Sequence, residues 1–82
     1  MNENTETETE YEGLVFVTPA RNRGGIVEVS YAAHADGVVE RVYDASDRSM
    51  SYGLAAWTSE LEEWFEAGGP QNSRPPAETR FF

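Results

Sequence analysis

Two runs of β-branched and apolar residues, 26–33 and 38–43, flank the turn sequence Ala-Asp-Gly at 35–37. In the first run, apolar residues alternate with Glu28 and Ser30, which is typical of a strand with one buried face. Asp-Gly between two such runs favours a hairpin, because glycine adopts positive φ without steric cost. Any fold of this chain is therefore expected to contain an antiparallel hairpin and to bury one of its faces.

A further strand is expected before the hairpin. Residues 14–18 form a compact apolar run that ends at Pro19, which cannot donate a backbone hydrogen bond. The pair Gly24-Gly25 then supplies the chain reversal into the hairpin. This order predicts an antiparallel meander of three strands.

The second half of the chain carries an apolar stripe at helical spacing. The stripe falls within an arc of ~100° on a helical wheel, as expected for a helix with one buried face. Its members are Leu54, Trp57, Leu61, Trp64 and Phe65. The stripe predicts a helix over residues 52–67, which the sequence Gly-Gly-Pro at 68–70 ends.

A second interpretation of this region stays open. Met50, Tyr52 and Leu54 alternate with smaller residues, as in a fourth strand. Ser59 and Glu62 have the spacing of a capping box, which predicts a short helix after that strand. We favour the long helix, because a stripe of five residues is harder to obtain by chance than a four-residue box.

The two ends differ from the centre in composition. Residues 2–10 alternate Thr and Glu with nothing to bury, and residues 71–82 are polar and contain Pro75-Pro76. We expect a disordered acidic tail over 1–11, a single small domain over 12–70 and a flexible Pro-containing tail over 71–82. The predicted fold class is α+β: a three-stranded, or in the second interpretation four-stranded, antiparallel sheet packed by one C-terminal amphipathic helix between disordered termini.

The charge of the chain bears on its partners. Fifteen acidic residues face six basic ones, all of them arginine, and the formal net charge is -9. Such a chain repels nucleic acid and anionic membranes and suits a basic protein partner. We therefore expect no direct nucleic-acid binding and no membrane association. With no apolar run of membrane-spanning length and no signal-like N-terminus, we expect a cytoplasmic protein.

No motif in the sequence indicates catalysis or a cofactor. The absence of lysine and cysteine excludes Schiff-base and thiolate chemistry, and the single histidine, His34, lies beside a turn. Glu40, Asp44 and Asp47 could gather around a cation, but they lack the spacing of a calcium loop. Arg21 and Arg23 form a basic island too small for nucleic acid. We predict a non-enzymatic protein without cofactor or metal.

The residues expected to bind a partner are four helix carboxylates, one tryptophan and the terminal aromatic pair. They are Glu60, Glu62, Glu63, Glu66, Trp57, Phe81 and Phe82. Tryptophan is enriched at binding hot spots as well as in cores. For the terminal pair three alternatives stay open, namely a docking peptide, a segment that folds back, and disorder.

In size and charge the chain resembles the small acidic inhibitors encoded by phages and mobile elements, including nucleic-acid mimics and anti-CRISPR proteins. That resemblance implies a module that engages a basic or nucleic-acid-binding site of a host protein. Two alternatives remain, a halophile-type domain whose acidity is an adaptation to salt and a carboxylate-based ligand-binding domain or enzyme. Twelve of the fifteen acids are Glu, whereas an extreme halophile is expected to use more Asp. A homodimer is a further alternative, because one helix is too small to cover both faces of a sheet.

Overall fold

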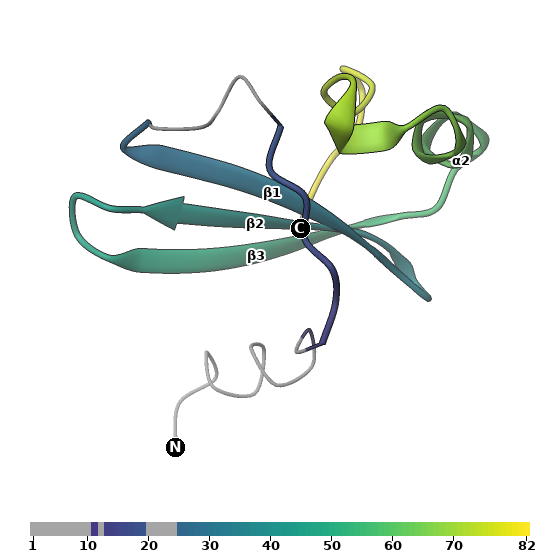
Figure 1. The fold of residues 1–82 in the computed structure, drawn as a ribbon. Coiled ribbons are helices and arrows are strands. Elements are labelled where there is room, and N and C mark those ends of the chain that lie inside the picture. The colour runs from purple at the N-terminus through teal and green to yellow at the C-terminus, as the bar shows by residue number, and fades with distance from the viewer. Residues whose placement is uncertain (1–10, 12, 20–24) are drawn as a thin grey trace.

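The computed structural model describes residues 11, 13–19 and 25–82. A three-stranded antiparallel sheet in the order β1-β2-β3 is followed by a short helix that packs on one of its faces (Figure 1). The elements are β1 (Val27–His34), β2 (Gly37–Asp44), β3 (Ser49–Ala56), α2 (Ser59–Glu66) and the 3-10 helix η2 (Gly69–Gln71). This is the α+β class that the sequence predicts.

The predicted hairpin is confirmed to within one residue at each strand end. β1 and β2 pair over their full lengths, with Tyr31 opposite Glu40 and His34 opposite Gly37. Gly37 has a φ of 158°. A Cβ added to it would overlap the carbonyl oxygen of Ala55 in β3, so only glycine lets the third strand approach at this point.

The predicted helix over 52–67 is wrong in its first half. Residues 49–56 form β3 and pair with β2 at all eight positions, and the helix begins only at Ser59. Sheet pairing prevails in part because a glycine at position 53 would weaken the interior of a helix. In the strand, Gly53 lets the C-terminal segment approach β3 closely, since a Cβ at this position would lie 3.0 Å from the Cβ of Phe81. The second interpretation of this region is therefore the right one, with Thr58 in place of Ser59 as the N-cap.

The third strand of the sheet is β3 and not the predicted segment 14–18. That segment touches the sheet at a single bridge, in which Val17 and Tyr31 exchange two backbone hydrogen bonds of 2.9 and 3.0 Å. In an antiparallel ladder the next residue of this segment to form hydrogen bonds after Val17 would be Pro19, which has no N–H to donate. The segment therefore covers the free edge of β1 without extending the sheet.

The core lies between the sheet and α2. Tyr31, on β1, meets the indole of Trp64 edge to face, with ring centroids 5.9 Å apart. The buried members of the cluster are Tyr31, Val38, Ala55, Leu61 and Trp64. The opposite face of the sheet is covered in part by Phe16, whose ring lies 4.2 Å from the guanidinium of Arg41 and packs beside Tyr52. Both faces of the small sheet are thus used by the chain itself.

The chain after η2 returns to the sheet, where its C-terminus is marked in Figure 1. Phe81 packs beside Tyr31, with ring centroids 5.8 Å apart, and Phe82 exchanges two backbone hydrogen bonds of 2.8 and 3.1 Å with Leu54 of β3. Among the three alternatives for the terminal aromatic pair, the structure shows the segment folded back. It covers the second edge of the sheet, which otherwise would invite pairing with another chain. The expected acidic tail falls, apart from Tyr11, outside the described residues.

Candidate interaction surface on helix α2

Helix α2 separates the core from an acidic surface. Its N-cap, Thr58, accepts a 3.1 Å hydrogen bond from the backbone N–H of Leu61, which satisfies one of the free donors of the first turn. Leu61 and Trp64 are buried against the sheet. The remaining face carries four exposed carboxylates, Glu60, Glu62, Glu63 and Glu66. We call these four residues the acidic face.

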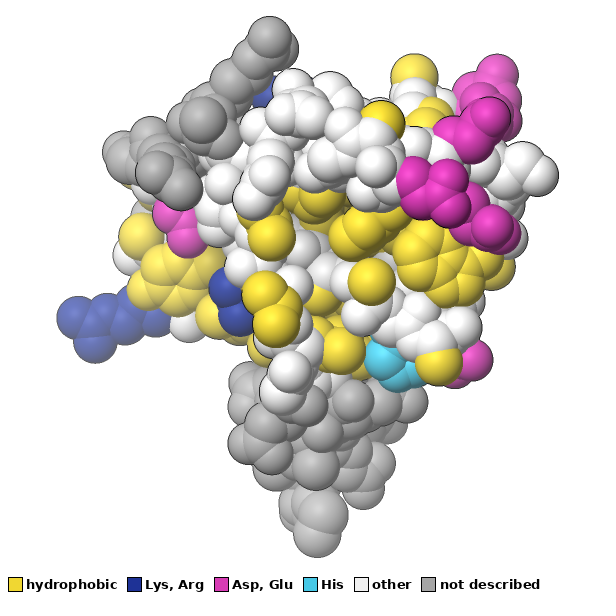
Figure 2. All heavy atoms as spheres, turned by 45° about the vertical axis from the view of Figure 1, so that its right-hand side comes forward, with side chains coloured by type: hydrophobic (Ala, Val, Ile, Leu, Met, Phe, Trp, Pro, Cys, Tyr) yellow, Lys and Arg dark blue, Asp and Glu magenta, His cyan; other side chains and the backbone are white. Residues whose placement is uncertain are grey.

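Figure 2 shows acidic side chains gathered at one corner of the molecule beside hydrophobic ones, with the basic side chains on the other side of the view. No residue of the acidic face has a basic side chain within ion-pair distance among the described residues. The last turn of α2 contains no basic residue. Glu62 and Glu66 stand one helical turn apart, so their like charges repel. No basic side chain in the described part of the chain therefore neutralises the acidic face.

A shallow hollow lies on one flank of α2. It has a volume of about 370 Å³ and is lined by Trp57, Phe65, Glu62 and Glu66, which we call the aromatic notch. The two rings lie 5.7 Å apart with their planes inclined by 72°, so they form a corner. The indole N–H of Trp57 donates a 2.9 Å hydrogen bond to the carbonyl of His34, which fixes the ring beside the hairpin turn. Apolar walls and a carboxylate rim suit a ligand that is flat, apolar on its faces and positively charged.

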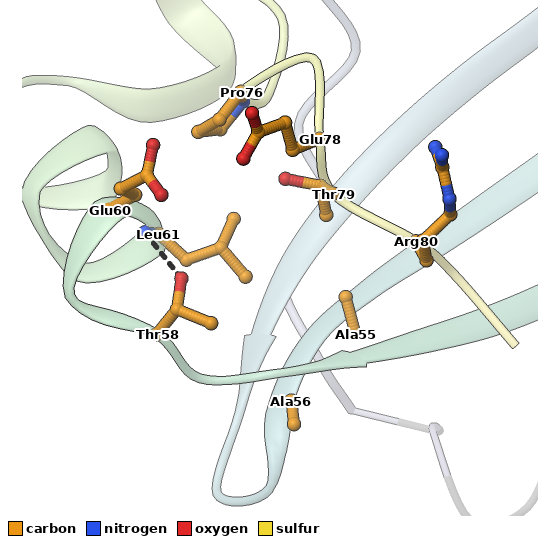
Figure 3. Close-up of a pocket in the computed structure, with 9 residues that line it drawn as sticks. All are labelled: Ala55, Ala56, Thr58, Glu60, Leu61, Pro76, Glu78, Thr79 and Arg80. Carbon is orange, nitrogen blue, oxygen red and sulfur yellow. Dashed lines mark hydrogen bonds between the residues drawn. The ribbon is translucent and has the colours of Figure 1, made fainter.

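A second hollow, of about 330 Å³, lies between the start of α2, the end of β3 and the returning C-terminal segment. Figure 3 shows Glu60 and Glu78 on one side of it, from two different segments, and Arg80 on the side away from Glu60. Its base includes Ala55 and Leu61, both buried. This C-terminal pocket thus combines two carboxylates with an arginine, and its charge is more balanced than that of the aromatic notch.

The structure divides the predicted partner-binding residues into four groups. Trp57, Glu62 and Glu66 meet at the aromatic notch, Glu60 lines the C-terminal pocket, and Glu63 lies exposed on the helix. Two further members lie on the sheet. Phe81 packs against the core cluster, and Phe82 is held through its backbone while its side chain is 91% exposed.

Sequence reasoning misses Phe65 of the aromatic notch and Glu78 and Arg80 of the C-terminal pocket. The sequence pattern places Phe65 in the buried stripe, but this residue stands at the flank of the helix and is only half-buried. Its position at the edge of the apolar arc is the one signal that could have indicated a surface role. Glu78 and Arg80 fall in the segment predicted to be a flexible tail, and nothing in their local sequence indicates that the chain returns to α2.

The three carboxylates considered as a cation site serve other purposes. Asp44 accepts hydrogen bonds from the backbone and hydroxyl of Ser46. The side chain of Ser49, followed by a hydrogen bond from its backbone N–H, lowers the pKa of Asp47. Glu40 accepts a 3.3 Å hydrogen bond from the hydroxyl of Tyr31. Within the described residues no three potential ligands from His, Cys, Asp or Glu cluster around a metal-sized space. The basic island at Arg21 and Arg23 lies outside the described residues.

Burial raises the pKa of Tyr31 to about 12, and the nearby negative charge of Glu40 acts in the same direction. The phenol therefore stays neutral and donates its hydrogen bond at physiological pH. This pair lies on the core side of the sheet, so we assign it to the stability of the fold.

Comparisons of the chain with protein-family models, curated proteins and solved structures found no match. Within the described residues, no helix has both the length and the apolar character needed to cross a membrane. Helix α2 and its two flanking hollows are therefore the candidate site of function.

Proposed function

We propose that this chain is a non-enzymatic protein-interaction module that binds a basic protein surface through the acidic face of α2. The observation that supports it is the set of four exposed carboxylates on an eight-residue helix, none of them ion-paired within the described residues. Negative side chains in the last turn oppose the helix dipole, and like charges one turn apart repel. A basic partner would relieve both costs, which is the expected behaviour of a binding surface.

The class of partner follows from the same charges. A surface with acids on a rigid helix and hydrophobic rings beside them can complement a basic groove, such as one that binds nucleic acid in a cytoplasmic host protein. In its specific form, the proposal is that the chain is a small acidic inhibitor of the kind that phages and mobile elements encode. Direct contact with nucleic acid is disfavoured by repulsion between phosphates and carboxylates.

An affinity capture with two matched variants tests this function. The bait is the full chain, offered to a lysate of its native host. In one variant Glu60, Glu62, Glu63 and Glu66 are changed to Gln, and in the other Glu3, Glu6, Glu8 and Glu10 are changed to Gln, so both lose four charges. We expect a basic protein to be retained by the wild type and by the N-terminal variant, and to be lost from the helix variant. Equal retention by the helix variant would show that recognition does not use α2.

Adaptation to salt makes a different prediction. If the carboxylates serve the solvent, the domain should unfold in dilute buffer and fold only in molar KCl. If the carboxylates instead serve binding, we expect a cooperative thermal transition in dilute buffer, because the domain has a buried apolar core and backbone hydrogen bonds at both edges of its sheet. Thermal melts followed by circular dichroism, at low and at molar KCl, distinguish these two predictions.

A further inference from the structure

We propose that the aromatic notch is the receptor for an arginine side chain of the basic partner. The inference rests on the proposed function and specifies the chemistry of one contact within it. The notch joins two half-buried rings, Trp57 and Phe65, to two exposed carboxylates, Glu62 and Glu66, in a single hollow of about 370 Å³.

The walls of the notch match the two sides of a guanidinium group. Its planar faces are weakly hydrated and stack on aromatic rings, whereas its edge carries five N–H donors that pair with carboxylates. The rings of Trp57 and Phe65 offer the aromatic walls, and Glu62 and Glu66 supply acceptors one helical turn apart. A lysine ammonium would use the carboxylates but would keep more of its hydration against the rings.

The chain itself makes a similar contact elsewhere. On the opposite face of the sheet, the guanidinium of Arg41 lies 4.2 Å from the centroid of the Phe16 ring. Each of the described arginines, including those of the C-terminal segment, lies beyond ion-pair distance of Glu62 and Glu66. Within the described residues, no arginine of the chain therefore pairs with the carboxylates of the notch. Their negative charge is left to pair with an arginine of a partner.

The rigid placement of the notch supports the same role. Trp57 is anchored by its hydrogen bond to the His34 carbonyl, and Phe65 meets Trp64 of the core edge to face, with ring centroids 5.2 Å apart. A preformed site binds a side chain without the entropic cost of ordering its own rings. Trp57 and Phe65 are thus held in position before a partner arrives.

The test is an NMR titration of the full, isotope-labelled chain with blocked tripeptides. The probes are N-acetyl-Gly-Arg-Gly-amide, its lysine analogue, and its citrulline analogue, which keeps the shape of arginine without its charge. We expect saturable shifts at the Trp57 indole N–H and at the Phe65 ring with the arginine peptide. The lysine and citrulline peptides should bind at least about twofold and about threefold more weakly, because one loses stacking and the other loses the charge.

Matched variants assign the contact to the notch. The double variant Glu62→Gln and Glu66→Gln should weaken arginine-peptide binding about two- to fivefold, as expected for the loss of exposed ion pairs. The control, Glu60→Gln with Glu63→Gln, removes the same charge from the same helix outside the notch, so it should weaken arginine-peptide binding less than the first double variant does. Phe65→Leu keeps an apolar side chain beside Trp57 and Trp64 but removes the ring, and it should also weaken binding.

Three results would overturn the notch proposal. They are shifts that fail to saturate at Trp57 and Phe65, equal binding of arginine and citrulline peptides, and equal loss of affinity in the two double variants. The last result would indicate a diffuse attraction to the acidic face, which contradicts the notch while leaving the proposed function standing. Failure of the proposed function is separate, because it appears as undiminished partner capture by the variant that lacks all four helix carboxylates.

Discussion

Replacing Glu66 by Gln should stabilise the domain, although Glu66 belongs to the surface that we assign to binding. Glu66 is the last residue of α2, is exposed, and has no basic neighbour in the final turn of the helix. Its charge faces the negative end of the helix dipole and lies one turn from Glu62 and Glu63. The isosteric amide removes these repulsions and leaves the buried face of the helix unchanged.

The magnitude follows from the separate contributions. A charge at the unfavourable end of an exposed helix costs about 0.3–1 kcal/mol, and each like-charged pair at this spacing costs about 0.2–0.5 kcal/mol. After allowance for solvent screening, Glu66→Gln should raise the free energy of unfolding by about 1 kcal/mol at low salt. For a domain of this size that is a rise in Tm of about 4–8 °C.

Thermal melts followed by circular dichroism, at low salt and in 1 M salt, measure the effect. Screening at 1 M shortens the Debye length to about 3 Å, so the gain should largely disappear there. Glu60→Gln is the matched control, because Glu60 lies in the first turn, where a negative charge is favourable. Its Tm should stay the same or fall.

Two outcomes would refute this reasoning. A fall in Tm for Glu66→Gln would mean that the carboxylate contributes to the fold. An equal rise in Tm for both variants would mean that the net charge of the chain, rather than the position of a carboxylate on the helix, determines how much that carboxylate destabilises the domain. Either result would remove the argument that the acidic face is maintained at the expense of stability.

Three further predictions concern the elements that position α2. Thr58→Ala removes the N-cap hydrogen bond and should lower the free energy of unfolding by about 1 kcal/mol in urea titrations, with Thr58→Ser close to wild type. Gly53→Ala places a Cβ 3.0 Å from that of Phe81, so it should loosen the C-terminal segment and speed amide exchange at Phe82 and Leu54, while exchange in the β1–β2 ladder stays slow. Tyr31 has a pKa of about 12 in the folded chain against 10.0 for the free side chain, so the unfolded state loses its proton first, and stability should decline as pH rises between these values. That alkaline decline should be smaller in Tyr31→Phe, and equal pH profiles would contradict the assignment.

The hairpin was predictable because its signals are local. Alternation within each strand and the Asp36-Gly37 turn determine the pairing with little help from the rest of the chain. Residues 49–56 were harder, since their alternation competes with a helical stripe that spans two elements. Leu54 and Trp57 share the spacing of the stripe without belonging to the helix. Leu54 also lies outside the core cluster, because its neighbour Ala55 faces that core and successive side chains of a strand point to opposite faces.

The candidate site was predictable only in part. The exposed carboxylates follow from helical periodicity, because residues opposite Leu61 and Trp64 must face solvent. The aromatic notch depends on where Trp57 lies after β3, and its position is set by a hydrogen bond to His34, a residue 23 positions away. The C-terminal pocket depends likewise on the return of Glu78 and Arg80 to the helix, which is a tertiary effect without a local sequence signal.

The absence of lysine from this chain permits a direct test of the central claim. Carbodiimide couples carboxylates to amines, and with no lysine the only amine of the chain is its N-terminus. Every other cross-link that starts from a carboxylate of this chain must therefore end at an amine of its partner. Mass spectrometry of the cross-linked complex should locate these bonds at Glu60, Glu62, Glu63 and Glu66. Cross-links confined to Glu3, Glu6, Glu8, Glu10 and Glu12, or to the strand loops at Asp36 and Asp47, would contradict recognition through α2.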